Sequence, residues 1–377
     1  MDLGGISAVI NKRGGHLKKR ILSPFIMAWA LVVICNSTNI NGQTEKETSA
    51  KNNWHKLLLK YPPSKDAIEL EPAGSFPSQE QESKGIYFAQ GRHIAHDNNN
   101  NIYISDMRGH AIYIFDSNGQ YLNKLGRAGQ GPGDLSSPHY FHITKDNTII
   151  VGETGNMRIQ FLDVNGAYLS SFKISRGYLS WITDNKGRIY AIPRLRPELN
   201  KIIEVLSPKG EVLESFGEPL KFKYEMSIYN DARICMNDKG DLLVGFTYLP
   251  LVRKYSSGGI LRKEIRIAGG LFEEKERSNL DNQARISRGE RSLYKPIVCS
   301  IRSSAKGFIF MHNYPRLEFQ EYDDDGKKLN TYWIELSNDY ITDTFDVLPD
   351  KEHGMKFYVL QLYPESKVDV FVPKKRR

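Results

Sequence analysis

Four histidines in two short segments form the one group of side chains here with a recognisable chemistry. His93 and His96 lie in RHIAHD, and His139 and His142 lie in HYFHIT. Imidazole nitrogen is a good ligand for zinc. Because side chains alternate along a strand, residues three positions apart such as His93 and His96 would lie on opposite faces. We therefore expect no bound metal, with a site built from these four histidines as the alternative.

The sequence contains no other recognisable catalytic motif. It has no GxSxG, no HExxH and no cysteine–histidine pair with an orienting carboxylate. The acidic run 323–325 lacks the spacing of a calcium loop, so we interpret it as a hairpin turn, with bound calcium as the alternative. Cys235 and Cys299 follow no CxxC pattern. We expect two free, buried thiols, with one disulfide between them as the alternative.

The charge of the chain does not indicate a nucleic-acid-binding protein. The formal net charge is +8, from 52 Lys and Arg against 44 Asp and Glu. Five of the basic residues and one acidic residue lie in the first 43 positions, which leaves 47 basic and 43 acidic residues. The last four residues, KKRR, are also basic, so the body of the chain is close to neutral and has no basic stripe. We expect no nucleic-acid partner.

The N-terminus has the composition of an export signal. Residues 12–20 are basic, the apolar run ILSPFIMAWALVVIC follows, and the next segment is polar. The run is short for a membrane-spanning helix, which needs about 20 residues. We therefore expect a signal peptide over 1–43, a polar linker over 44–65 and an exported protein of the periplasm or cell surface. The alternatives are an uncleaved anchor and a lipid anchor at Cys35, and for an exported, cleaved protein the lipid anchor would be the only link to a membrane.

Two short patterns alternate along the rest of the chain. The first is a polar turn followed by a β-branched or aromatic strand, as in DNNNNIYISD (97–106). The second is a strand, a tight turn with glycine and another strand, as in YIFDSNGQYL (113–122). Such turns suit hairpins, because glycine adopts a positive φ and Asp or Ser bonds to its own backbone. The first pattern occurs six times, with separations of 47, 39, 53, 67 and 47 residues.

Four short antiparallel strands in each of six such units are typical of a six-bladed β-propeller. We therefore expect an all-β propeller over 66–377 with four strands in each blade. The last unit shows three strands, ending at 367–372, and a ring left open there would expose a strand edge. Residues 66–76 resemble the fourth strands of other units. We predict that this N-terminal segment (66–81) supplies the closing strand and pairs with 367–372.

The segment NNNNIYISDMRGHAIYIFDSNGQYLNKLGRAGQGPGDLSSP (98–138) closely resembles the NHL-type repeat of six-bladed propellers. In particular it is similar to the exported six-bladed propeller proteins of Bacteroidetes. The resemblance implies the fold over most of the chain and little about activity, since such propellers serve as lyases, lactonase-like enzymes and binding scaffolds. Some NHL-type lyases bind zinc through channel histidines from several blades, whereas the third, fourth and fifth units here offer no inner-strand histidine.

Two segments depart from the repeat. The glycine-rich stretch GRAGQGPGDLSSP (126–138) is followed by no helix start and no GK[ST]. We interpret it as a tight crossover between two blades, with an anion cradle as the alternative. Residues 268–296 lengthen the fourth spacing to 67 residues and form an inserted loop or a short helix over 271–286. This insertion is either a solvated excursion or a lid or partner-binding arm over the channel mouth.

The innermost strand of each blade lines the channel and decides which side chains a ligand meets. An alignment on the second strands makes five channel positions equivalent, namely Ala95, His142, Ile182, Cys235 and Ile301. Aromatic and arginine side chains dominate binding hot spots. From these strands we select four ligand contacts: Trp181, Arg233, Arg302 and His142.

These observations favour a non-catalytic binding propeller of the bacterial cell envelope. We expect a monomer without a cofactor, whose partner is a small molecule or an envelope protein. The alternative is a metal-dependent lyase or lactonase-like enzyme that holds zinc or calcium in the central channel. The sequence names neither the ligand nor the substrate.

Overall fold

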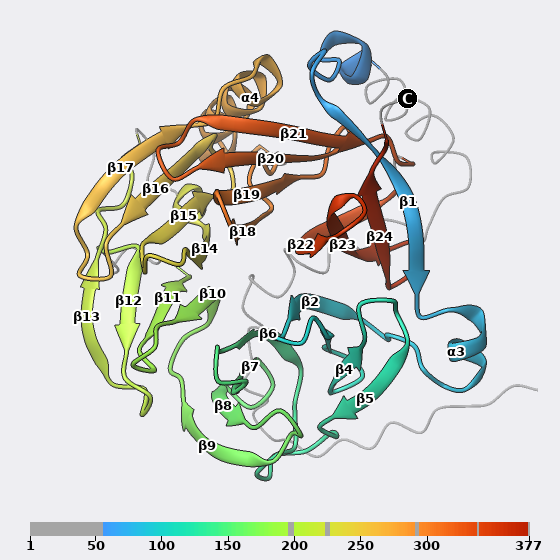
Figure 1. The fold of residues 1–377 in the computed structure, drawn as a ribbon. Helices are drawn as coiled ribbons and strands as arrows, with labels where there is room; N and C mark the ends of the chain where they lie inside the picture. The colour runs from blue at the N-terminus through green and yellow to red at the C-terminus, as the bar shows by residue number, and fades with distance from the viewer. Residues whose placement is uncertain (1–55, 195–199, 223–226, 291–293, 338, 376–377) are drawn as a thin grey trace, which may run out of the picture. The chain divides into compact units, whose positions relative to one another are not determined.

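The computed structural model describes residues 56–375, apart from 195–199, 223–226, 291–293 and 338 (Figure 1). The expected signal peptide, Cys35 and most of the expected linker lie outside the described residues. Within that linker, residues 56–60 form a short helix. Within the described residues, no helix is both long and apolar enough to cross a membrane.

The described residues contain 24 strands, which form six blades of four strands around a central channel (Figure 1). Blade 1 contains β2 (Gly91–His96), β3 (Ile102–Asp106), β4 (Ala111–Phe115) and β5 (Tyr121–Leu125). Blade 2 contains β6 (Pro138–Ile143), β7 (Ile149–Glu153), β8 (Arg158–Leu162) and β9 (Tyr168–Lys173). Blade 3 contains β10 (Tyr178–Thr183), β11 (Ile189–Pro193), β12 (Ile203–Leu206) and β13 (Val212–Phe216).

The other three blades follow the same order from the inside outward. Blade 4 contains β14 (Ala232–Met236), β15 (Leu242–Phe246), β16 (Leu251–Tyr255) and β17 (Leu261–Arg266). Blade 5 contains β18 (Ser300–Ser304), β19 (Gly307–His312), β20 (Leu317–Asp323) and β21 (Lys328–Ile334). Blade 6 contains β22 (Ile341–Asp350), β23 (Gly354–Tyr363), β24 (Lys367–Pro373) and, as its outer strand, β1 (Ile68–Phe76).

Strand β1 closes the ring. It pairs antiparallel with β24, from Leu70 opposite Pro373 to Phe76 opposite Val368. At its start it also pairs in parallel with β21, where Ile68 lies opposite Tyr332. Blades 1 to 4 are therefore separate four-stranded sheets, whereas blades 5 and 6 form one eight-stranded sheet joined through β1. The predicted closure of the ring by the N-terminal segment is confirmed.

The hydrophobic core lies between neighbouring blades. All five residues of β3 and of β4 are buried, because these middle strands have a blade against each face. This double burial explains why the sequence shows continuous apolar runs there instead of an alternating pattern. The closing strand takes part in the same packing, since the rings of Phe76 and Phe115 lie 4.8 Å apart between blades 6 and 1.

The two ends of the ring differ. At the turn end, the inner strand of each blade turns into the second strand, as in residues 97–101 and 144–148. At the crossover end, the outer strand of one blade leads to the inner strand of the next. Helix α4 (Gly270–Ser287) is inserted between β17 and β18 and therefore lies at the crossover end. Two shorter helices are α3 (Gln79–Ser83) after β1 and the 3-10 helix η1 (Ser227–Asn230) before β14.

Candidate functional site

The inner strands place six residues at one level of the channel, one from each blade. Backbone pairing with the second strands gives these as Ala95, His142, Ile182, Cys235, Arg302 and Asp346. The expected position of Ile301 in this set is wrong. The connection 304–307 in blade 5 has four residues where 97–101 in blade 1 has five, so Arg302 takes the level that the alignment gave to Ile301.

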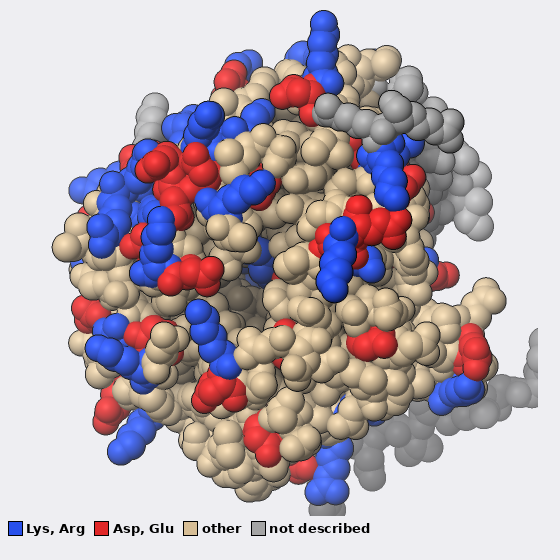
Figure 2. Space-filling model, viewed as in Figure 1, with Lys and Arg blue, Asp and Glu red and all other residues tan. Residues whose placement is uncertain are grey.

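A cavity of about 1020 Å³ occupies the channel and reaches the turn end. Figure 2 shows the ring hollowed at its centre, with blue Lys or Arg atoms visible inside. Its inner lining includes His96, Tyr140, His142, Arg302 and Asp346, and the turns of blades 2, 3 and 4 line its mouth. Small-molecule sites in proteins commonly enclose about 300–1,000 Å³. The cavity is therefore large enough for a molecule rather than for a single ion.

Tyr140 is held rigidly in this cavity by an aromatic stack across three blades. Its ring lies 4.0 Å from that of His93 in blade 1 and 4.6 Å from that of Trp181 in blade 3. A Cβ at Gly152 would come within 2.0 Å of the Trp181 ring, so the stack needs glycine there. Burial raises the pKa of Tyr140, so its hydroxyl stays protonated at neutral pH. That hydroxyl has no hydrogen-bond partner within the described residues.

His142, like Tyr140, lines the cavity and has no hydrogen-bond partner in the part of the chain that the structure describes. It lies two positions beyond Tyr140 on β6 and half-buried. Burial lowers its pKa to about 4, and the nearby charge of Arg302 acts in the same direction. The imidazole is therefore neutral at pH 7, with one ring nitrogen that donates and one that accepts.

Arg302 is already engaged by the protein. Its Nη2 donates to the carbonyl oxygen of Ile94 at 3.1 Å and to Oγ1 of Thr344 at 3.4 Å. Its Nε lies 3.6 Å from Oδ1 of Asp346, whose other oxygen lies 2.7 Å from Nδ1 of His96. This Arg302 clamp joins blades 5, 6 and 1. The side chain lines the cavity as the sequence suggested, but most of its donors are used within the fold.

The other two selected contacts lie away from the cavity lining. Trp181 is 3 % exposed and belongs to the packing between blades 2 and 3. Arg233 is half-buried on β14, nearer the crossover end, and its Nη1 donates to the carbonyl oxygen of Ala232 at 3.3 Å. The structure thus brings His142 and Arg302 together in the cavity and leaves Trp181 and Arg233 outside it.

The four histidines of the metal alternative do not converge. His93 stacks on Tyr140, His96 pairs with Asp346, and His139 accepts a hydrogen bond from Arg92 at 3.2 Å. Nδ1 of His93 also lies 3.4 Å from Oγ1 of Thr344, so His93 contacts blades 2 and 6, whereas His96 pairs with blade 6 alone. Within the described residues, no three His, Cys, Asp or Glu side chains gather where they could hold a metal ion. These residues therefore do not fit zinc.

The acidic turn 323–325 also does not fit calcium. Asp323 accepts from the backbone of its own turn, at the N–H groups of Asp325 and Lys327. Asp324 pairs with Lys239 and accepts from Asn237 of blade 4. Basic side chains and backbone donors occupy the oxygens that calcium would need. The run is a hairpin turn that links blades 5 and 4.

Cys235 and Cys299 are both free and buried. Cys235 lines the cavity and Cys299 immediately precedes β18. Burial raises the pKa of each thiol to about 12, so neither is a thiolate at neutral pH. They therefore behave as small apolar residues and not as nucleophiles.

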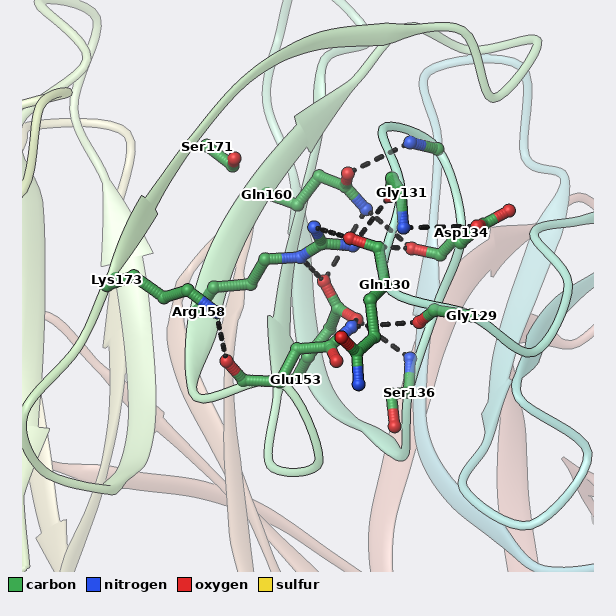
Figure 3. Close-up of polar contacts among 12 residues, drawn as sticks. Gly129, Gln130, Gly131, Asp134, Ser136, Glu153, Arg158, Gln160, Ser171 and Lys173 are labelled. Carbon is green, nitrogen blue, oxygen red and sulfur yellow. Dashed lines mark hydrogen bonds and ion pairs between the residues drawn. The ribbon is translucent and has the colours of Figure 1, made fainter.

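The glycine-rich stretch is a crossover held by one arginine (Figure 3). Arg158 donates to the carbonyl oxygens of Gln130, Gly131 and Asp134 at 2.9, 3.0 and 2.7 Å, and it pairs with buried Glu153. An anion cradle would present free N–H groups. Here the N–H of Gly131 donates to Asp134, and several carbonyl oxygens point at the arginine instead. The structure supports a crossover between blades 1 and 2.

Helix α4 is fixed to the ring by buried polar side chains. Lys275 is 3 % exposed, and its Nζ lies 3.2 Å from the carbonyl oxygen of Pro296 and 3.0 Å from Nε2 of His312. Asn279 is fully buried and donates to the carbonyl oxygens of Tyr248 and Lys295. Because the helix lies at the crossover end, it does not cover the mouth of the cavity at the turn end. It is not a lid over this cavity.

Two residues of the site, Tyr140 and Asp346, were missed from the sequence, whereas His142 was selected. Tyr140 and His142 are two positions apart on an inner strand, so strand alternation alone places them on the same side. Asp346 carries a weaker signal, because its partner His96 is 250 positions away in the sequence. An alignment of the inner strand of blade 6 with the others would have placed a carboxylate at the level of His142.

Comparisons with known proteins agree with the architecture. Residues 92–176 match a family described as a 6-bladed beta-propeller. No curated protein sequence matches the chain. The fold is similar to that of a protein from Bacteroides fragilis described as exported, with a TM-score of 0.55, 12% identity, and 84% of this chain and 98% of that chain covered.

Two further solved structures have the same fold. A member of the duf4221 family from Bacteroides vulgatus has a TM-score of 0.55 and 12% identity, with 83% of this chain and 100% of that chain covered. A virginiamycin B lyase from Staphylococcus aureus, solved with quinupristin, has a TM-score of 0.51 and 9% identity, with 81% and 100% covered. At these identities the likeness concerns the fold alone.

Proposed function

We propose that this six-bladed β-propeller is a non-catalytic binding protein of the bacterial cell envelope. Its ligand is a small, uncharged, hydroxyl-rich molecule such as a short saccharide, held in the channel cavity. The observation that carries the proposal is the pair Tyr140 and His142, two neutral side chains that line the cavity and have no hydrogen-bond partner within the described residues. A phenol and a neutral imidazole both donate and accept hydrogen bonds, as sugar hydroxyls do.

The charges around the cavity support an uncharged ligand. Asp184 pairs with Arg188 at 2.8 Å, and Lys145 pairs with Asp238 at 3.8 Å. These two ion pairs come in addition to the Arg302 clamp described above. Most lining charges are therefore compensated within the protein. In the inner part of the cavity, a charged ligand would have to bury its charge beside charged groups that are already paired, which is costly. A ligand with hydroxyl groups would lose little by leaving water, because the cavity replaces its hydrogen bonds.

Two arguments support a location in the cell envelope. The N-terminal order of a basic, an apolar and a polar segment favours export, and a structural neighbour from Bacteroides is described as exported. Catalysis has less support, because the described histidines hold no metal arrangement and the thiols are protonated. The lyase named above shares the fold at 9% identity, which transfers no activity to this chain.

Titration calorimetry with the full chain at pH 7 tests the proposal. The probes are glucose, N-acetylglucosamine, maltose, cellobiose and maltotriose, with glucuronate and glucosamine as charged counterparts. We expect saturable binding of at least one neutral saccharide and weaker binding of the charged ones. Tyr140→Phe and His142→Phe should each weaken binding about tenfold, whereas Tyr168→Phe on the exposed outer strand β9 should not. If none of the neutral saccharides binds, the proposal is wrong.

A further inference from the structure

The crossover end of the channel carries a second group of polar side chains, outside the cavity. Arg92, His139 and Arg233 are each the second residue of an inner strand, in blades 1, 2 and 4. Blade 3 adds Arg194, which directly follows β11. Its backbone N–H donates to the carbonyl oxygen of Gly177 at 3.1 Å, and Gly177 directly precedes β10. Four consecutive blades thus contribute a basic or imidazole side chain to the same end of the channel. None of the four lines the cavity at the turn end.

Backbone irregularities direct several of these side chains. The pairing of β2 with β3 shifts between Gly91 and His93, and the pairing of β6 with β7 shifts between Pro138 and Tyr140. Arg92 and His139 are therefore the extra residues of two β-bulges, and Nη2 of Arg92 lies 3.2 Å from Nε2 of His139. A bulge re-aims a side chain that regular alternation would turn away. The sequence maintains this distortion in two neighbouring blades.

The positive charge at this end is only partly compensated. Arg194 and Arg233 form no ion pair within the described residues, and Arg233 has a single hydrogen bond, to the neighbouring carbonyl oxygen. Burial, together with the charges of Arg92, Arg233 and Arg194, lowers the pKa of His139 to about 3. Three guanidinium groups therefore act on one neutral imidazole. Such a concentration of positive charge at one end of the channel attracts anions.

Two carboxyl groups lie at the same end of the channel, because Asp231 directly precedes β14 and Asp343 lies near the start of β22. Asp231 forms no ion pair within the described residues, and burial raises its pKa to about 6 against the lowering effect of Arg233 and Arg194. Asp343 is the extra residue of a bulge in β22, and its Oδ1 is buried without a hydrogen-bond partner. Asp343 and Arg233 both act electrostatically on the buried thiol of Cys299, which immediately precedes β18 at this end of the channel. The crossover end thus holds an unused acceptor oxygen together with under-compensated arginines.

We propose that the crossover end of the channel is a binding site for a small carboxylate that also carries a hydrogen-bond donor, such as a hydroxy acid or an amino acid. The carboxylate binds between Arg194 and Arg233 beside His139, since guanidinium groups pair with carboxylates through parallel N–H···O bonds. The hydroxyl or ammonium group of the ligand donates to Asp343. This site does not rest on the saccharide cavity at the turn end, and either can exist without the other.

Titration calorimetry of the full chain at pH 7 with lactate, alanine and propionate separates the parts of this proposal. The three probes share a three-carbon carboxylate, and propionate lacks the donor. We expect saturable binding of lactate and alanine, and about tenfold weaker binding of propionate. Arg233→Gln and Arg194→Gln should each weaken all three about tenfold, while Arg233→Lys recovers part of the affinity. Asp343→Ala should weaken lactate and alanine to the level of propionate.

Lys186→Gln is the matched control, because Lys186 is an exposed basic residue at the opposite end of the ring. It should leave all three affinities unchanged. Circular dichroism of each variant shows whether the fold is kept, and Arg233→Lys provides a second test if Arg233→Gln does not fold. Absence of saturable binding, or affinities unaffected by both arginine variants, overturns the site. Equal binding of propionate and lactate overturns the role of Asp343.

Discussion

Nδ1 of His96 lies 2.7 Å from Oδ2 of Asp346, which joins the inner strand of blade 1 to that of blade 6. The Asp346 side chain is 3 % exposed, and its other oxygen lies 3.6 Å from Nε of Arg302 in blade 5. One buried carboxylate therefore connects three blades on the inside of the ring. On the outside, β1 joins blades 5 and 6. Neighbouring blades are thus joined both at their inner strands and at their outer strands.

Asp346→Asn should destabilise the protein by about 3 kcal/mol, because it leaves Arg302 partly buried without its counter-ion. Urea unfolding at pH 6.5 measures this loss. Asp238→Asn is the control, since that side chain is 88% exposed and its ion pair with Lys145 spans 3.8 Å, and it should change the free energy of unfolding little. Equal effects of the two substitutions would show that Asp346 contributes no more to stability than an exposed aspartate.

The His96–Asp346 pair predicts that the stability of the protein depends on pH above neutrality. The charge of Asp346 raises the pKa of His96 above its usual value. The folded state therefore holds the proton to a higher pH than the unfolded state, and the stabilisation is complete below about pH 6.5 and lost as pH rises through the folded pKa. We expect the free energy of unfolding to fall between pH 6.5 and 8.5, and to fall less in His96→Asn. Parallel profiles for the two proteins would contradict this.

For His142 we predict the opposite pH dependence of the free energy of unfolding, at acidic pH. Burial lowers its pKa to about 4, so between pH 4 and 6.5 the unfolded state binds a proton that the folded state does not. Stability should therefore fall as pH decreases through this window. His142→Asn should reduce the loss between pH 6.5 and 4.5 by about 1 kcal/mol, a discounted figure because the ring is half-buried. Chemical unfolding at the two pH values measures the difference, and an unchanged loss would mean that His142 is protonated in the folded protein.

Ring closure can be tested from the outside. Phe76 is 2% exposed and packs on Phe115 between the last blade and the first. Phe76→Ala should cost about 3–5 kcal/mol through the cavity it leaves. Leu122→Ala, at a 50% exposed position of the outer strand β5, should cost little. If both substitutions cost the same, the closing strand contributes no more than an exposed position.

Most of the architecture could be predicted from the sequence because it depends on local signals. Glycine turns and buried apolar runs recur in every blade, and the edge left open by the last unit required the strand found at 68–76. The channel was harder to predict. A connection one residue shorter in blade 5 moved Arg302 into the position expected for Ile301, and a one-residue slip changes the face of every side chain beyond it.

The remaining misses concern contacts between distant residues. The pairs Tyr140–Trp181 and His96–Asp346 join separate blades, and nothing in the local sequence of either partner indicates the other. The aromatic and arginine side chains selected as hot spots were chosen by type alone. The structure uses Trp181 for packing and Arg302 as a clamp, while Tyr140, which was not selected, lies in the cavity.

The location of the ligand in the channel cavity is tested most directly by filling that cavity. Ser303 is exposed to it on β18, and Ser303→Trp would occupy the space that the ligand needs. The measurement is the dissociation constant of the neutral saccharide that binds the unmodified chain most tightly, with Leu122→Trp on the outer strand as control. We predict that Ser303→Trp weakens binding at least about a hundredfold, roughly 2.7 kcal/mol, and that Leu122→Trp leaves it unchanged. Unaltered affinity in a folded Ser303→Trp variant would contradict the account.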